Sequence, residues 1–206
     1  MKLLRETVRR ILLQEGMITL DQLPEDIFVE IWVKGKVAII RYMKEHPKSG
    51  FLVTPSPETD PIWGLVIIRK SEDQIGLWEV TQAGAADGCG PLLYDVAMEY
   101  ATENGIGLVS DRRNVSDGKD GAQGVWNYYL KHRDGVDVQA HQMDDLDNTL
   151  TDTPKDNIKQ DIAKKTTGWF NADGSISYWY QSPLSKRFTK EPTLLSRYED
   201  KRIVYK

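Results

Sequence analysis

The chain has 206 residues, and its 27 Lys and Arg against 31 Asp and Glu residues give a formal net charge of −4. This small acidic excess offers no electrostatic argument for a nucleic acid as the main partner. No apolar stretch approaches the roughly 20 residues that span a bilayer, and the single Cys89 cannot close an internal disulfide. We therefore expect one soluble globular domain with additional segments. The lack of an internal disulfide is compatible with a reducing compartment.

Residues 1–15 are predicted to form a short amphipathic helix. Its apolar residues share one face, its basic residues lie largely elsewhere, and Gly16 ends it. Charges interrupt the segment, so it does not have the apolar core of a secretory signal. One alternative is that this helix packs against the domain or against a partner.

The other alternative comes from a resemblance. This helix, ending in Leu13, Gln14 and Glu15 directly before Gly16, resembles the N-terminal capsid-targeting peptides of internal head proteins in large contractile-tailed bacteriophages. The resemblance implies a processing site at Leu13, Glu15 and Gly16 that a prohead protease cuts. It also implies head proteins as partners and the interior of the virion head as a location.

The first half of the domain is predicted to be rich in strands. Runs of β-branched and aromatic residues predict strands over 27–33 and 37–43, with a hairpin turn at residues 34–36 between them. After two proline-containing loops, further apolar runs predict strands over 62–69 and 75–80. This order favours a mixed, mainly antiparallel sheet.

A loop of small residues follows the strand at 75–80 and leads into a helix. The loop contains Gly84, Gly88 and Gly90, and Pro91 stands at the first helical position, where its missing N–H costs nothing. Apolar residues at helical spacing follow until the helix stops at residues 104–105. Free backbone N–H groups at the start of a helix favour a phosphate or another anion.

The run that begins at Val80 resembles the acetyl-CoA-binding motif of the GNAT acetyltransferase superfamily, roughly V-x-P-x-x-R/Q-x-x-G-x-G-x-x-L. Gly88 and Gly90 match this motif. Gln82 stands where Pro is usual, and Ala85 stands where an Arg or Gln would help to hold the cofactor pyrophosphate. The resemblance therefore includes the glycines but not the usual basic residue.

The resemblance extends over residues 62–145, with 107–111 as the next strand and 116–130 as the next helix. It implies an α/β (α+β) fold with a GNAT-like, mainly antiparallel sheet and flanking helices. Acetyl-CoA would be the co-substrate, and an amine that the sequence does not identify would be the acceptor. The implied GNAT-like domain covers residues 16–150, followed by a C-terminal extension over 151–206.

The resemblance assigns cofactor binding to the glycine loop and the strand before it. Backbone N–H groups of the loop would hold the pyrophosphate, and the strand edge would take the pantetheine arm as an added strand. Arg112 is a candidate to replace the missing Arg. The candidate cofactor residues are Val80, Ala85, Ala86, Asp87, Gly88, Cys89, Gly90 and Arg112. The alternative is that the glycines only close a strand-to-helix turn.

Two side chains are candidates for the proton transfers. Glu79 could take the proton of the amine, and Tyr129 could return a proton to the thiolate, although the usual Tyr position holds Trp126. Alternatively, Glu79 is a charge on an exposed strand face and Tyr129 belongs to a buried stripe. Cys89 is interpreted as a small filler, because no His is close to it in sequence.

The remainder of the chain is predicted to add a strand over 136–142, a polar helix over 153–165, an aromatic hairpin over 169–180 and a basic, mostly irregular tail. His141 and the acidic residues after it match no known metal-site spacing, so no metal is expected. The aromatic residues of this hairpin could stack on nucleic acid bases, but such residues more often form a small hydrophobic core packed against the domain.

Two functions follow from these patterns. The first is a GNAT-like N-acetyltransferase in the host cytoplasm, or packaged in a phage head, that transfers an acetyl group to an unknown amine. The second is a catalytically inactive GNAT-fold protein that serves as an internal virion or interaction protein. The glycine spacing favours the first function, whereas Gln82, Ala85 and the displaced Tyr favour the second.

Overall fold

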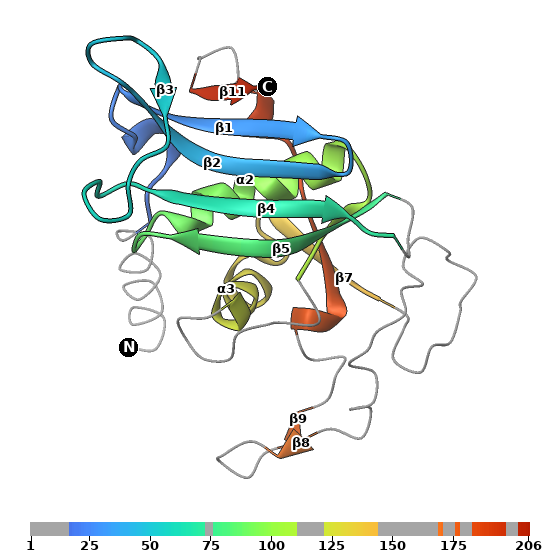
Figure 1. Cartoon of the computed structure of the whole chain (residues 1–206). Helices are drawn as coiled ribbons and strands as arrows, with labels where there is room; N and C mark the ends of the chain where they lie inside the picture. The colour runs from blue at the N-terminus through green and yellow to red at the C-terminus, as the bar shows by residue number, and fades with distance from the viewer. Residues whose placement is uncertain are drawn as a thin grey trace. The chain divides into compact units, whose positions relative to one another are not determined.

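The computed structural model describes residues 17–72, 76–110, 122–143, 169–170, 176–177, 183–196 and 202–206. The predicted N-terminal helix with Leu13, Glu15 and Gly16, the predicted helix at 153–165, and Arg112 lie outside these residues. The described part is a mixed α/β structure with a mainly antiparallel nine-stranded sheet and two α-helices (Figure 1). The predicted α/β (α+β) fold class is therefore confirmed.

The main sheet has the hydrogen-bonded order β11-β1-β2-β4-β5-β6-β10-β7, with β3 paired to β2, and a separate sheet joins β8 to β9. The strands are β1 (Ile27–Lys34), β2 (Val37–Glu45), β3 (Leu52–Val53), β4 (Gly64–Lys70), β5 (Leu77–Ala85), β6 (Gly107–Val109), β7 (Val138–Gln142), β8 (Trp169–Phe170), β9 (Ile176–Ser177), β10 (Lys186–Lys190) and β11 (Ile203–Tyr205). The helices are α2 (Gly90–Glu103), α3 (Ala122–Tyr128), the π-helical turn η2 (Tyr129–Arg133), and the 3-10 turns η1 (Leu20–Gln22) and η5 (Pro183–Ser185).

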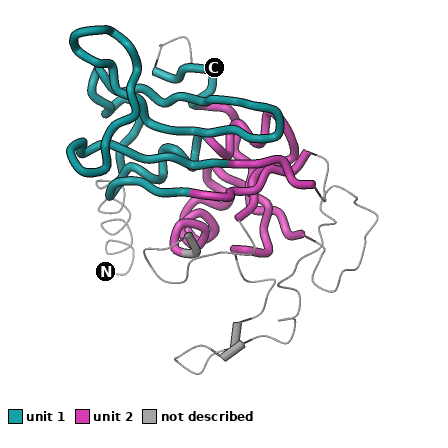
Figure 2. The backbone as a smooth tube through the Cα atoms, in the orientation of Figure 1, with its two compact units in different colours: residues 1–67, 83–96, 194–206 teal, residues 68–82, 97–193 magenta. Residues whose placement is uncertain are grey.

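The chain forms two compact units, each built from segments that are distant in sequence (Figure 2). Unit 1 contains Met1–Ile67, Ala83–Val96 and Leu194–Lys206, and unit 2 contains Ile68–Gln82 and Ala97–Thr193. The strands β4 and β5 and the helix α2 each contribute residues to both units.

The β1–β2 hairpin is the centre of unit 1. Antiparallel pairing runs without interruption from Ile27↔Lys44 to Lys34↔Val37. The turn contains Gly35 with φ of 60°, a conformation that glycine adopts without strain. The strands β1 and β2 alternate apolar side chains toward one buried face, as a half-covered sheet requires. The predicted hairpin is therefore confirmed.

The part of the main sheet in unit 2 contains both parallel and antiparallel strand pairs. The start of β5 pairs in parallel with β6, β6 pairs with β10 at Leu108↔Phe188, and β10 pairs with β7. Trp126, Tyr129 and Phe188 are fully buried and place their rings within 6.5 Å of one another. This aromatic cluster forms much of the core of unit 2.

Two of the sequence predictions need correction. The strand expected at 75–80 continues to Ala85, so part of the expected loop is extended chain. The small residues there have a packing reason, because a Cβ added at Gly64 would come within 2.7 Å of the Cβ of Ala85. The tail expected to be irregular supplies β10 and β11, whose partners β6, β7 and β1 are far away in sequence.

Candidate functional site

The two parallel strands of unit 2 separate after a short paired stretch. The register is Leu77↔Gly107, Trp78↔Leu108 and Glu79↔Val109, and there the pairing of β5 with β6 ends. The strand β5 continues beyond Glu79 to Ala85. Within the described ranges, no further strand pairs with β5 on this side. A strand that extends beyond its parallel neighbour can accept an extended ligand as an added strand.

Glycines hold the two strands together at the end where they are paired. The N–H of Ile106 donates to the carbonyl oxygen of Gly76 at 2.8 Å. A Cβ added at Gly105 would lie 1.8 Å from that same oxygen, and one added at Gly107 would lie 2.7 Å from the carbonyl oxygen of Phe188. Only glycine fits at either position, so the chain at Gly105 lies close to Gly76, and β6 at Gly107 lies close to β10.

Glu79 and Val80 occupy the point of separation. Glu79 is the last residue of β5 that pairs with β6, and its side chain is half-buried. Val80 is 5% exposed and, since strand side chains alternate, faces the opposite side of the sheet. The structure thus places both predicted residues where the pairing of β5 with β6 ends.

The loop between β5 and α2 belongs to unit 1 and is not covered. Gly88 adopts a φ of 76°, and both Gly88 and Gly90 are partly exposed. The N–H of Ala86 donates to Trp63 O at 3.1 Å, and the N–H of Cys89 donates to Ala86 O at 3.0 Å. In this part of the described chain, the N–H groups of Asp87 and Gly88 have no recorded acceptor. The donors that the loop can offer are therefore fewer than the sequence suggested.

Two contacts hold the carbonyl groups of the loop. The buried hydroxyl of Tyr42 donates to Cys89 O at 2.8 Å, and the N–H of Ile18 donates to Gly88 O at 3.0 Å. Because a trans peptide directs its C=O and N–H to opposite sides, the first contact turns the N–H of Gly90 away from Tyr42. Burial raises the pKa of Tyr42 far above its ordinary value, so its hydroxyl stays a donor.

Two features of the loop oppose anion binding. Asp87 is exposed and adds a negative charge beside Gly88. Ala85, which replaces the usual Arg or Gln, packs against Gly64 and Gly90. The candidate replacement Arg112 lies outside the described residues.

Cys89 is buried in unit 1, with its Sγ 4.0 Å from the carbonyl oxygen of Pro61. Burial raises the pKa of its thiol, and the nearby charge of Asp87 acts in the same direction. An activated cysteine has a lowered pKa, so this environment agrees with the small-filler interpretation.

Tyr129 is fully buried and is the first residue of the π-helical turn η2. Its ring contacts the aromatic cluster with Trp126 and Phe188, and the Arg133 guanidinium lies 5.5 Å from its ring centre. These contacts give Tyr129 a packing role, and its role as an acid stays a prediction. The neighbouring Tyr128 is half-buried and lies against His132.

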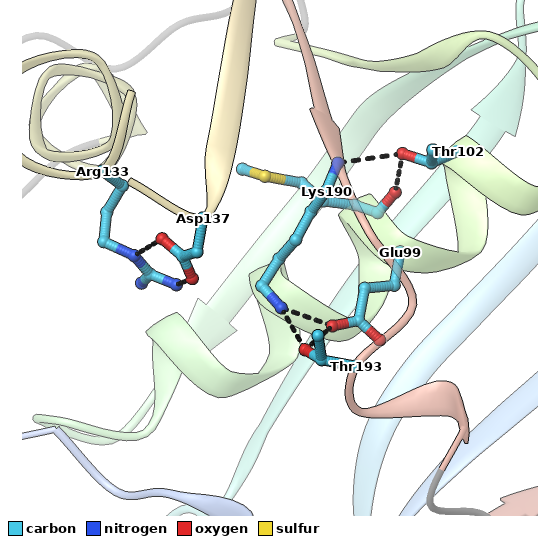
Figure 3. Close-up of polar contacts among 7 residues, drawn as sticks. Glu99, Thr102, Arg133, Asp137, Lys190 and Thr193 are labelled. Carbon is cyan, nitrogen blue, oxygen red and sulfur yellow. Dashed lines mark hydrogen bonds and ion pairs between the residues drawn. The ribbon is translucent and has the colours of Figure 1, made fainter. Parts of the chain in front are cut away.

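A buried ionic cluster joins α2 to β10 inside unit 2 (Figure 3). The Lys190 ammonium pairs with the Glu99 carboxylate and donates to Thr193 Oγ1 at 2.9 Å. Thr193 in turn donates to Glu99 at 2.9 Å, and the backbone N–H of Lys190 donates to Thr102 Oγ1 at 3.1 Å. Sequence analysis missed this cluster, because its members are far apart in the chain and resemble ordinary surface residues.

His141 lies in a polar environment. Its Nε2 lies 2.9 Å from Thr189 Oγ1, and burial, helped by Arg187, lowers its pKa. In the described parts of the chain, no group of three or more His, Cys, Asp or Glu residues could hold a metal ion.

None of the helices among the described residues has both the length and the apolar character needed to cross a membrane. The chain matches no family model, no curated protein and no solved structure. Any family assignment therefore rests on the residues and the geometry of this chain alone.

Proposed function

We propose that this protein is a GNAT-like N-acetyltransferase that transfers an acetyl group from acetyl-CoA to an amine. The observation that carries the proposal is the parallel pairing of β5 with β6. This pairing ends at Glu79↔Val109, whereas β5 continues to Ala85. A glycine-containing loop and then helix α2 follow β5. This order offers a strand for a pantetheine arm to lie beside and backbone donors for a pyrophosphate.

The proposal gives each part of acetyl-CoA a binding element. The N–H groups of Asp87, Gly88 and Gly90 in unit 1 would bind the pyrophosphate, at the start of a helix whose dipole favours anions. The strand β5, which leads directly into this loop, would bind the arm. The backbone N–H near Val80 would donate to the thioester oxygen and stabilise negative charge there.

The reaction requires two proton transfers. The amine nitrogen attacks the thioester carbon, Glu79 takes the proton of the amine directly or through water, and the C–S bond then breaks. The leaving thiolate takes up a proton, for which Tyr129 is the candidate donor. Tyr129 is fully buried in the free protein.

A second candidate function is a catalytically inactive GNAT-fold protein inside a virion. Three observations favour it: Ala85 in place of the usual basic residue, the exposed Asp87 beside the loop donors, and the burial of Tyr129. In this case the N-terminal peptide would direct the protein to a phage head, with the prohead protease and head proteins as partners.

Titration with acetyl-CoA tests the first function. A ligand that binds only the folded state stabilises it by about 2.7 kcal/mol at one hundred times its Kd, so the thermal midpoint should rise with acetyl-CoA concentration. Release of CoA in the presence of lysine peptides or polyamines would then show transfer. Binding without release favours the second function, and absence of binding contradicts the first.

A further inference from the structure

Asn104 and Gly105 are the only Asn-Gly pair in the sequence, and they directly follow helix α2 within unit 2. Asparagine is one of the thermally labile residues. It loses its amide group when the backbone nitrogen of the next residue attacks its side-chain carbonyl carbon, and a glycine there has no side chain to hinder the attack. Asn104 is exposed, so water reaches it. The pair is therefore a candidate site of spontaneous chemical modification.

Hydrogen bonds hold the side chain of Asn104 back in the folded protein. Its Nδ2 donates to the carbonyl oxygen of Tyr100 at 3.0 Å, and its backbone N–H donates to the same oxygen at 2.9 Å. Both donors point back along α2, whereas the nitrogen of Gly105 lies on the other side of the Asn104 Cα. Attack requires the two reacting atoms to meet at about 3–3.5 Å with the right orientation. The side chain must therefore leave Tyr100 before it can react.

The backbone after Asn104 is packed too tightly to lengthen. A Cβ added at Gly105 would lie 1.8 Å from the carbonyl oxygen of Gly76 and 3.0 Å from Cδ1 of Trp78. The N–H of Ile106 donates to the same Gly76 oxygen at 2.8 Å, and Trp78 Nε1 donates to the carbonyl oxygen of Asn104 at 3.3 Å. An extra main-chain atom at this point would have to displace these contacts.

We infer that Asn104 is a deamidation site that the folded protein protects, and that reaction there after the end of α2 opens prevents return to the native packing. The Gly105 nitrogen forms a bond to Cγ of Asn104 and passes its proton to water, while the Cγ–Nδ2 bond breaks and ammonia leaves. Water then opens the cyclic imide. Opening at Cγ gives aspartate, and opening at the main-chain carbonyl gives isoaspartate, whose main chain is longer by one carbon atom.

Both products disturb the end of α2. The carboxylate of aspartate cannot donate to the carbonyl oxygen of Tyr100, and it adds negative charge at the helix C-terminus, where the helix dipole is already negative. Isoaspartate lengthens the main chain next to Gly105, where no room is left. Because the ammonia is lost, the change is permanent. This inference is independent of the proposed function, and water is its only co-reactant.

The rate of deamidation tests the protection. The full chain is incubated at neutral pH in buffer and in unfolding concentrations of urea, and peptide mass spectrometry follows Asn104. Asn127, which lies in α3 before Tyr128, is the internal control. We expect Asn104 to react clearly faster than Asn127 in urea, and at least about tenfold more slowly in buffer than in urea, because the reaction waits for local opening. Equal rates at Asn104 in buffer and urea would overturn the protection, and equal rates at Asn104 and Asn127 in urea would overturn the site.

Two variants test the chemistry and its consequence. Asn104→Gln keeps an amide but places its carbonyl carbon one bond farther away, so the release of ammonia from this position in urea should largely stop. Asn104→Asp reproduces one product and should lower the thermal midpoint by about 3 °C. Wild-type protein that is deamidated in urea and then refolded should show a loss at least as large. Unchanged midpoints in both samples would overturn the claim that the products cannot regain the native packing.

Discussion

The hydroxyl of Tyr42, from the middle of β2, donates a 2.8 Å hydrogen bond to the carbonyl oxygen of Cys89 in the loop before α2. Tyr42 is fully buried, so this bond fixes the peptide between Cys89 and Gly90 from inside unit 1. The orientation of the loop backbone therefore depends on a residue of a distant strand as well as on the glycines of the loop.

Replacing Tyr42 by Phe should weaken both the fold and the binding of acetyl-CoA. The ring still fills its site, but the carbonyl of Cys89 loses its donor, and an unpaired buried acceptor costs about 1–3 kcal/mol. Urea denaturation would measure the loss in the free energy of unfolding, and calorimetry would measure the affinity. The half-buried Tyr128→Phe serves as the control. Unchanged stability in Tyr42→Phe would contradict the role of this bond.

Breaking the Glu99–Lys190 pair should be strongly destabilising. Both side chains are at most 5% exposed, so Glu99→Leu leaves a buried ammonium that keeps its hydrogen bond to Thr193 but loses its ion-pair partner. We expect a loss of about 3–5 kcal/mol for Glu99→Leu and recovery of most of it in Glu99→Leu/Lys190→Met. Chemical denaturation would measure both values.

The less buried Arg133–Asp137 pair, with side chains 17% and 40% exposed, is drawn in the same view and provides the comparison (Figure 3). Asp137→Ala should cost about 1 kcal/mol, less than Glu99→Leu, because water screens a partly exposed pair. Similar losses for the two pairs would contradict the importance of burial.

Replacing Asp87 by Asn should tighten the binding of acetyl-CoA. Its exposed carboxylate lies beside the N–H groups proposed to hold the pyrophosphate, so removing one negative charge should lower the Kd by about threefold. The gain should shrink as salt is added, because salt screens exposed charges. Glu58→Gln, in an exposed loop of the same unit, should leave the Kd unchanged. If Asp87→Asn has no effect at low salt, the pyrophosphate does not bind at this loop.

Stability should fall as the pH drops below 6.5, with His141 as one cause. Burial lowers the pKa of His141 in the folded protein below its ordinary value of 6.5. The unfolded chain therefore takes up a proton at a higher pH than the folded protein, which favours unfolding as the pH falls from 6.5 through the folded pKa. His141→Gln should flatten this part of the stability profile. Denaturation midpoints at a series of pH values would measure it, and an unchanged profile would exclude His141.

Local patterns in the sequence were enough to predict several elements. The turn around Gly35 and the apolar runs beside it predicted β1 and β2 closely, because a hairpin is specified by adjacent residues. The stop at Asn104-Gly105 likewise predicted the end of α2. These elements depend on contacts that lie close together in the chain.

Elements that depend on distant partners were missed. Phe188 lies in a segment that was expected to be irregular. It forms part of a strand because it pairs with Leu108 on one side and with Ala140 on the other. In the candidate site, sequence could suggest Gly88 and Glu79, but it could not tell which backbone N–H groups are already bonded. The sequence also could not show that the hydroxyl of Ser110 is buried without a hydrogen-bond partner, because a serine after an apolar strand resembles any strand end.

The pairing of early strands with late ones has a consequence during synthesis. Strand β1 leaves the ribosome long before β11, and β6 long before β10, so both edges stay bare while the intervening chain is made. Bare strand edges readily join other chains. The nascent protein is therefore most prone to aggregate just before its last strands emerge, and a product that ends prematurely in this region would keep both edges open.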